Sequence, residues 1–185
     1  MIEKVKVIFF LLGSIFAQEN CRIASADTRV TVDVPQKTIS IMQENLFTTL
    51  ENEANYKYTQ KQFYEIVKQP KLSKELGNFT LESLDFLKDG KKLHAMIKLR
   101  FKSAEDLRYM GLYLSKQKDS LAHVNVKEWK ISSEEGTLND KYWFFDMAKP
   151  FTFSFDLNDK MQRKYDDKVS GLLPVYEAIM AWKEE

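Results

Sequence analysis

The alternation of side chains in the segment 151–157 constrains this fold more than any other feature of the sequence. Phe151, Phe153 and Phe155 occupy every second position, and polar residues separate them. Successive side chains of a β-strand point to opposite faces, so the three phenyl rings lie along one side of a strand. A row of rings of this kind needs a cover that shields it from water.

The C-terminal segment is predicted to supply that cover as a long helix. Asn158 or Asp159 is expected to cap it, and it would run to about Lys183 with a kink at Gly171 and Pro174. Its apolar residues repeat at steps of three and four, as in an amphipathic helix: Met161, Tyr165, Val169, Leu172, Leu173, Tyr176 and Met180.

The first 26 residues are predicted to be a secretory signal peptide. Two lysines precede the apolar run 7–17, which is too short to span a bilayer, and polar residues follow it. Cleavage after Ala17 or after Ala26 fits the pattern, and the second position leaves a single domain of residues 27–185. The alternative is an uncleaved N-terminal anchor.

Cysteine content and charge indicate where the mature chain works. Cys21 is the one cysteine, so cleavage after Ala26 leaves none, which suits a periplasmic or secreted protein that relies on its core rather than on disulfides. The mature chain keeps 25 basic and 25 acidic residues, with both signs interleaved. This balance argues against nucleic acid or an anionic membrane as partner, and we expect no integral membrane span in the mature chain.

The remaining pattern predicts one strand, then two helices, then a series of strands. Two helices are expected, one over 37–54 and one from a capping box at Thr59 to near Pro70. One strand is expected before the helices, at 29–34, and the others after them, at 79–87, 93–101, 124–131, 142–145 and 151–157.

Several local features refine this order. The strand from residue 79 changes phase at 82–83, which indicates a bulge, and Gly90 supplies the turn into the next strand. The segment 103–117 fits either a helix capped by Ser103 and Asp106 or a strand over 108–115, and a hairpin turn at 116–119 favours the strand. The segment 142–145 is apolar on both faces, and 132–140 reads as a polar loop.

The expected fold class is therefore α+β. It comprises a curved antiparallel β-meander of about six or seven strands, two N-terminal helices, and a long C-terminal helix packed on the sheet.

In this order of elements the chain resembles the helix-grip architecture of the START and Bet v 1-like superfamily, with local echoes at Val32–Pro35 and Gly171–Pro174. The segments Tyr58–Gln60, Lys68–Pro70 and Gly77–Phe79 are similar to the start of periplasmic lipoprotein carriers of the LolA type. Both resemblances imply an acyl or other apolar group held between a curved sheet and helices.

The sequence shows no arrangement that would carry out a reaction. His94 and His123 are the two histidines, and neither has a Cys or His at ligand spacing, so we expect no metal site and no cofactor. His94 is expected to face solvent. No Gly-rich phosphate loop, nucleophile elbow or Cys/His pair is present. We therefore expect a protein that is not an enzyme.

The leading expectation is an exported protein that binds, and could transport, a lipid or other apolar ligand between its sheet and its last helix. The residues expected to line that site are Ile97, Leu99, Phe101, Phe151, Phe153, Phe155, Tyr165, Leu172, Tyr176 and Met180. The alternative is a module with a solid core that binds an envelope protein through Tyr109, Tyr113 and Trp129.

Overall fold

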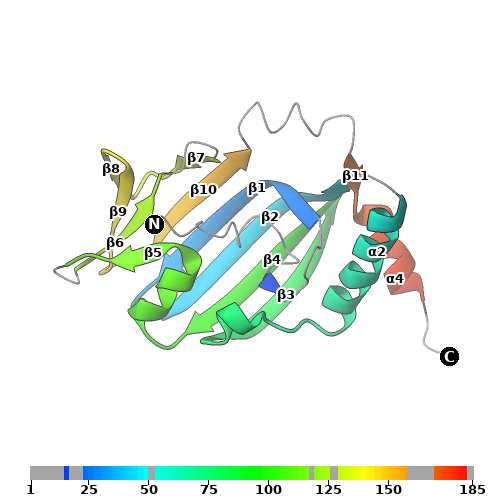
Figure 1. The fold of residues 1–185 in the computed structure, drawn as a ribbon, viewed down its shortest axis with the longest axis horizontal. Coiled ribbons are helices and arrows are strands. Elements are labelled where there is room, and N and C mark those ends of the chain that lie inside the picture. Colours follow the sequence, from blue (N-terminus) through cyan, green and yellow to red (C-terminus); the bar gives the residue numbers. More distant parts are fainter. Residues whose placement is uncertain are drawn as a thin grey trace.

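The fold is α+β, with two antiparallel sheets and a C-terminal helix (Figure 1). The computed structural model describes residues 15–16, 23–49, 53–116, 119–125, 129–157 and 169–182. The larger sheet lies in the middle, the smaller sheet at one end, and two helices pack together at the other end (Figure 1).

In the part of the chain that the structure describes, the larger sheet has seven strands, six of them in the order β3-β4-β2-β1-β10-β7. Its seventh strand, β11, pairs with the end of β2 that lies beyond β4. The strands are β1 (Ile23–Asp33), β2 (Thr38–Thr49), β3 (Phe79–Asp89), β4 (Lys92–Phe101), β7 (Trp129–Ser132), β10 (Phe151–Leu157) and β11 (Val169–Gly171). Since β10 lies beside β1, the order is not that of a simple meander.

The smaller sheet has four strands in the order β5-β6-β9-β8. They are β5 (Leu112–Leu114), β6 (Ser120–Val124), β8 (Thr137–Asn139) and β9 (Tyr142–Asp146). The helices within the described residues are α2 (Glu53–Lys68), α4 (Leu173–Ala181) and two short 3-10 helices, η1 (Lys74–Leu76) and η2 (Ala104–Met110).

The hairpin of β3 and β4 confirms the sequence pattern closely. The inward residues of β4 are all buried, and they are Leu93, Ala95, Ile97, Leu99 and Phe101. The pairing with β3 shifts between Leu81 and Ser83, which confirms the predicted bulge. Gly90 has a φ of +55°, the left-handed conformation that the turn needs.

The predicted helix over 37–54 is wrong, because β2 occupies most of that segment. The buried side of β2 changes at Asn45, which has a φ of +53°. Ile39, Ile41 and Gln43 are buried before this point, and Leu46 and Thr48 after it. Buried residues alternate along a regular strand, but here the alternation shifts by one position at Asn45. The resulting spacing of apolar residues resembles that of a helix.

The long C-terminal helix is also wrong as predicted. Val169–Gly171 forms β11, and α4 begins only at Leu173 and contains nine residues. Pro174 lies in the first turn, where a missing N–H costs the helix nothing, so it starts the helix instead of kinking it. The expected cap at Asn158 or Asp159 lies outside the described residues.

Two predicted boundaries around the helices change as well. The helix α2 begins at Glu53, so Thr59 lies inside it and does not cap it. The capping box of Ser103 and Asp106 is present and opens η2, so the predicted strand 108–115 is limited to Leu112–Leu114.

The predicted strand 124–131 is two strands, β6 and β7, which belong to different sheets. The predicted polar loop 132–140 contains β8. In β9, Phe145 is buried but Tyr142 is exposed, so this strand is not buried on both faces.

Candidate functional site

The buried face of the larger sheet is the floor of the candidate site. Residues in register across four strands form two apolar rows on this face. One row is Leu99, Ile39, Val32 and Phe151, and the other is Ile97, Ile41, Val30 and Phe153. All eight side chains are buried. The predicted site residues of β4 and β10 therefore share one face, with β2 and β1 between them.

Among the described residues, the phenylalanine row is covered by the smaller sheet and not by α4. The ring of Phe145, from β9, stacks on Phe151 with a centroid distance of 4.4 Å. The ring of His123, from β6, lies 5.5 Å from Phe153 and 5.6 Å from Phe155. Aromatic contacts at these distances are those of a packed core, so this end of the face is filled.

The predicted site residues near the C-terminus lie apart from the phenylalanine row. Leu172 is buried, and its N–H donates to the carbonyl of Leu46 over 3.0 Å. Tyr176 packs against Phe86 with a centroid distance of 5.2 Å. Met180 is 56% exposed and does not line an interior site. Tyr165 lies outside the described residues.

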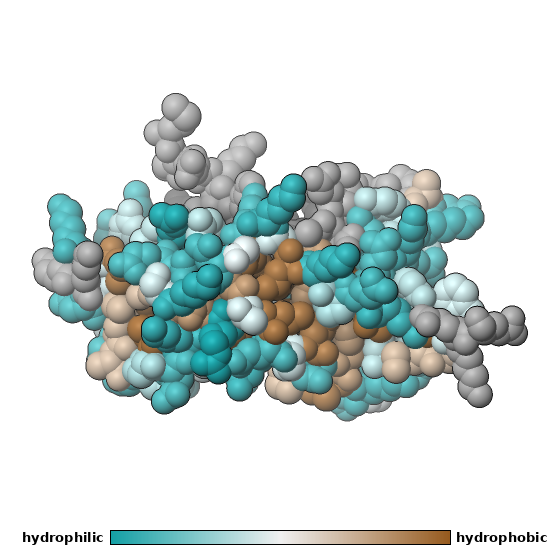
Figure 2. Space-filling view, turned by 90° about the horizontal axis from the view of Figure 1, so that it is seen from below, coloured by the Kyte–Doolittle hydropathy of each residue, from teal (hydrophilic) through white to brown (hydrophobic). Residues whose placement is uncertain are grey.

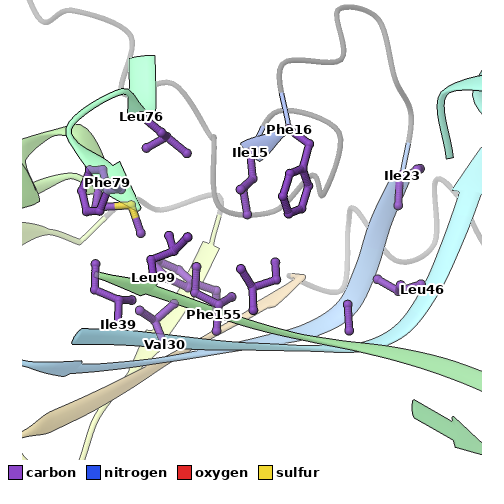
Figure 3. Close-up of a cluster of buried hydrophobic side chains, with 14 of the residues drawn as sticks. Ile15, Phe16, Ile23, Val30, Ile39, Leu46, Leu76, Phe79, Leu99 and Phe155 are labelled. Atoms are coloured by element: carbon purple, nitrogen blue, oxygen red, sulfur yellow. The ribbon is translucent and has the colours of Figure 1, made fainter. Parts of the chain in front are cut away.

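The middle of the floor is covered by Ile15 and Phe16, each of which is only 1% exposed. Both side chains project toward the sheet, between the group of Leu76 and Phe79 and the group of Ile23 and Leu46 (Figure 3). Sequence reasoning missed both residues, because an apolar run near an N-terminus has the same composition whether it is a leader or part of a core.

The carbonyl of Ile15 accepts a hydrogen bond from the N–H of Ser73 over 2.9 Å. Ser73 lies in the connection between α2 and η1. This bond therefore joins the residues that cover the floor to that connection.

A hydrogen-bonded cluster of buried polar side chains interrupts the apolar floor. The hydroxyls of Ser25 and Thr28 lie 2.7 Å apart, and Nε2 of Gln43 donates to Oγ of Ser25 over 3.3 Å. Thr28 is in register with Phe155 on one side and with Gln43 on the other. The floor thus offers uncharged polar groups among apolar ones, which is the usual composition of a small-molecule site.

Titratable groups take little part in this face. Burial lowers the pKa of His123, although its bond to the Val124 carbonyl acts the other way, so the ring is neutral near pH 7. His94 is half-buried instead of facing solvent, and its Nε2 has no partner in the described structure. Within the described ranges, no three His, Cys, Asp or Glu side chains gather as metal ligands would.

A second apolar surface lies between the two helices. An open groove of about 610 Å³ is lined by residues of α2 and α4, among them Tyr56, Tyr64, Val175 and Ile179, and by Trp182, which follows α4. Apolar residues also gather in the middle of the face seen from below, between polar flanks, on the side where β3 forms the edge of the larger sheet (Figure 2).

Over the parts of the chain that the structure describes, no helix is both long and apolar enough to cross a membrane. Comparisons with models of protein families, with curated proteins and with solved structures find no match to this chain.

Proposed function

We propose that this is an exported, non-enzymatic protein that binds an apolar ligand, a lipid or acyl chain, on the buried face of its larger sheet. The ligand occupies the space that Ile15 and Phe16 fill in the full chain. One observation carries the proposal: both residues belong to the predicted signal peptide, and both are buried against the sheet.

Removal of the leader would uncover the floor. Cleavage after Ala17 removes Ile15 and Phe16 and leaves β1 complete from Ile23. Cleavage after Ala26 would also remove Ile23–Ser25, which pair with β2, so the structure supports Ala17. An empty apolar space is unfavourable, since its lining loses contacts on one side. An apolar ligand restores those contacts.

A curved sheet is part of the proposal. The change of buried side at Asn45 in β2 is matched in β1, where Ser25 and then Thr28 face inward. Such irregularities bend a strand pair and increase its twist. The resemblances to helix-grip proteins and to LolA-type carriers imply the same kind of site.

Compared with the residues expected from the sequence, the proposed lining of the site adds Val30, Ile39 and Leu46 and leaves out Met180.

A binding role fits the chemistry of the face. The polar cluster of Ser25, Thr28 and Gln43 consists of two hydroxyls and an amide, which form hydrogen bonds but do not exchange protons near neutral pH.

The test is to express the full chain in a host that exports it and to purify it without detergent. We expect an intact mass that corresponds to loss of residues 1–17, together with an extractable lipid. Val30→Phe should weaken binding of a fluorescent fatty acid, because the added ring enters the space above the floor. Ser40→Phe is the matched control on the opposite, exposed face of the sheet. A processed protein that carries no lipid and does not bind the probe would refute the proposal.

A second candidate function, binding to an envelope protein, is supported by the outer face of the smaller sheet. Tyr113 is 48% exposed and Tyr142 is 44% exposed, and Phe144 lies beside them. Tyr109, which was expected to join this surface, is half-buried under the guanidinium of Arg108. Trp129 was also expected there, but its side chain is not among those that the structure describes. A photo-crosslinker at position 113 should capture one defined protein that the same group at Ser40 does not. Equal labelling from both positions would eliminate this candidate.

A further inference from the structure

The contacts of Ile15 and Phe16 indicate what kind of molecule could replace them. Their side chains supply hydrocarbon to the floor of the sheet, and the Ile15 carbonyl supplies one acceptor to Ser73. An acyl group offers the same two features, a hydrocarbon chain and a carbonyl oxygen.

Ser73 would be left with unused donors when this segment leaves. Its side chain is buried, and its Oγ has no partner among the described residues. Its own carbonyl is already engaged, because it accepts the N–H of Leu76 over 2.9 Å. A buried N–H without an acceptor is strongly disfavoured. The vacated site therefore favours a ligand with an acceptor at this point.

The surroundings of Ser73 favour a neutral acceptor beside it. The two nearest lysines in the sequence, Lys71 and Lys74, are exposed, and the polar groups on the floor are uncharged. A carbonyl oxygen needs one or two donors and no counter-ion. Esters and amides provide this group, whereas an alkane of equal length does not, and a fatty acid near pH 7 carries a charged carboxylate instead.

We propose that the ligand is an acyl compound whose carbonyl oxygen accepts the N–H of Ser73 in place of the Ile15 carbonyl. This inference rests on the proposed function, because it requires the leader to depart and an apolar ligand to enter.

The test compares two probes of nearly equal length, methyl hexadecanoate and heptadecane, on the exported and processed protein. The wild type should bind the ester roughly 3- to 10-fold more tightly than the alkane, the difference in affinity that one neutral hydrogen bond contributes. Ser73→Pro should lose this preference and still bind the alkane. Proline fits here because Ser73 has a φ of −62°, and the substitution removes the N–H together with the hydroxyl. Ser73→Ala is the matched control, since it removes the hydroxyl, keeps the N–H and should keep most of the preference.

The outcomes separate the two proposals. If the wild type binds the ester and the alkane equally, the acyl inference is wrong and the proposed function stands. If the wild type binds neither probe, both are wrong. Should Ser73→Pro fail to fold, the amide proton of Ser73 decides: its NMR signal should move downfield with the ester and not with the alkane, and an unchanged signal would overturn the inference.

Discussion

At the scale of single residues, Gly136 is the position where one added methyl group would disturb the core most directly. A Cβ on Gly136 would lie 2.6 Å from Cε1 of Phe145 and 2.9 Å from Cε3 of Trp143. The loop has little freedom to move away, because the hydroxyl of Ser133 accepts the N–H of Gly136 and donates to the carbonyl of Thr152.

Gly136→Ala should therefore lower the free energy of unfolding by about 1–3 kcal/mol, as overpacking of a filled core does. The measurement is urea denaturation followed by tryptophan fluorescence. Gly171→Ala is the control, because a Cβ there would meet no atom within 4 Å, and its effect should be near zero. Equal losses in the two variants would contradict the close packing around Phe145.

His123 gives the second prediction at this scale. Burial lowers its pKa below the ordinary value of 6.5, so between the folded-state pKa and pH 6.5 the unfolded chain binds more protons than the folded chain. The free energy of unfolding should then fall as the pH falls through this window. His123→Phe keeps a ring against Phe153 and Phe155 and should flatten this part of the profile, with a constant offset for the lost bond to Val124. Denaturation curves between pH 5 and pH 8 measure it, and parallel profiles for the two proteins would disprove the assignment.

At the scale of elements, η2 depends on one carboxylate. Burial alone would raise the pKa of Asp106, but N–H groups of Ser103 and Lys102 and the amide of Asn78 donate to it, and the pKa is lowered overall. The stability that it contributes is present above the ordinary pKa of 3.8 and is lost as the pH falls through the folded-state value.

Asp106→Asn should cost about 1–2 kcal/mol at pH 7, since it replaces an acceptor of several hydrogen bonds at a helix start. The difference from the wild type should shrink below pH 3.8, where the wild-type carboxyl becomes protonated. Thermal unfolding at pH 7 and pH 3 measures both effects. A difference that stays constant with pH would show that the charge of Asp106 does not contribute.

The elements that could be predicted from the sequence are those set by local contacts. The hairpin of β3 and β4 depends on strict alternation and on Gly90, and both can be read from a short window. The strand β2 could not be predicted, because Asn45 moves its buried side and the stretch then mimics helical spacing. What identifies β2 is its pairing with β1 and β4, which lies outside any local pattern.

At the scale of the whole molecule, the same limit applies to the site. The row of Phe151, Phe153 and Phe155 was predicted to be buried, and it is. Its cover was assigned to the next helix in the chain, yet Phe145 and His123 come from a separate sheet. Alternation shows that a face must be covered but not which segment covers it. Ile15 and Phe16 show the same difficulty, because their apolar character fits a leader and a core equally well.

The proposed function predicts competition between the leader and the ligand. The full chain, kept unprocessed by expression without export, should bind a fluorescent fatty acid at least about tenfold more weakly than the processed protein, because a tethered segment acts at a high effective concentration. The double substitution Ile15→Asp and Phe16→Asp should restore binding to the unprocessed chain, since charged side chains are costly to bury.

Replacing two exposed residues, Lys71→Gln and Lys74→Gln, lowers the net charge by the same two units and is the control for charge; this variant should leave ligand binding by the unprocessed chain weak. Equal affinities for the processed and unprocessed proteins would show that Ile15 and Phe16 do not occupy the ligand's place.

The position of β10 beside β1 also sets the order in which the molecule can be completed during synthesis. The first four strands of the larger sheet come from residues 23–101, but β1 lacks its second neighbour until residues 151–157 have been made. Until then one side of β1 is an open edge, of the kind that pairs with other chains. Folding of this sheet is therefore a late event in the life of the nascent chain, and a chain that ends before β10 should aggregate.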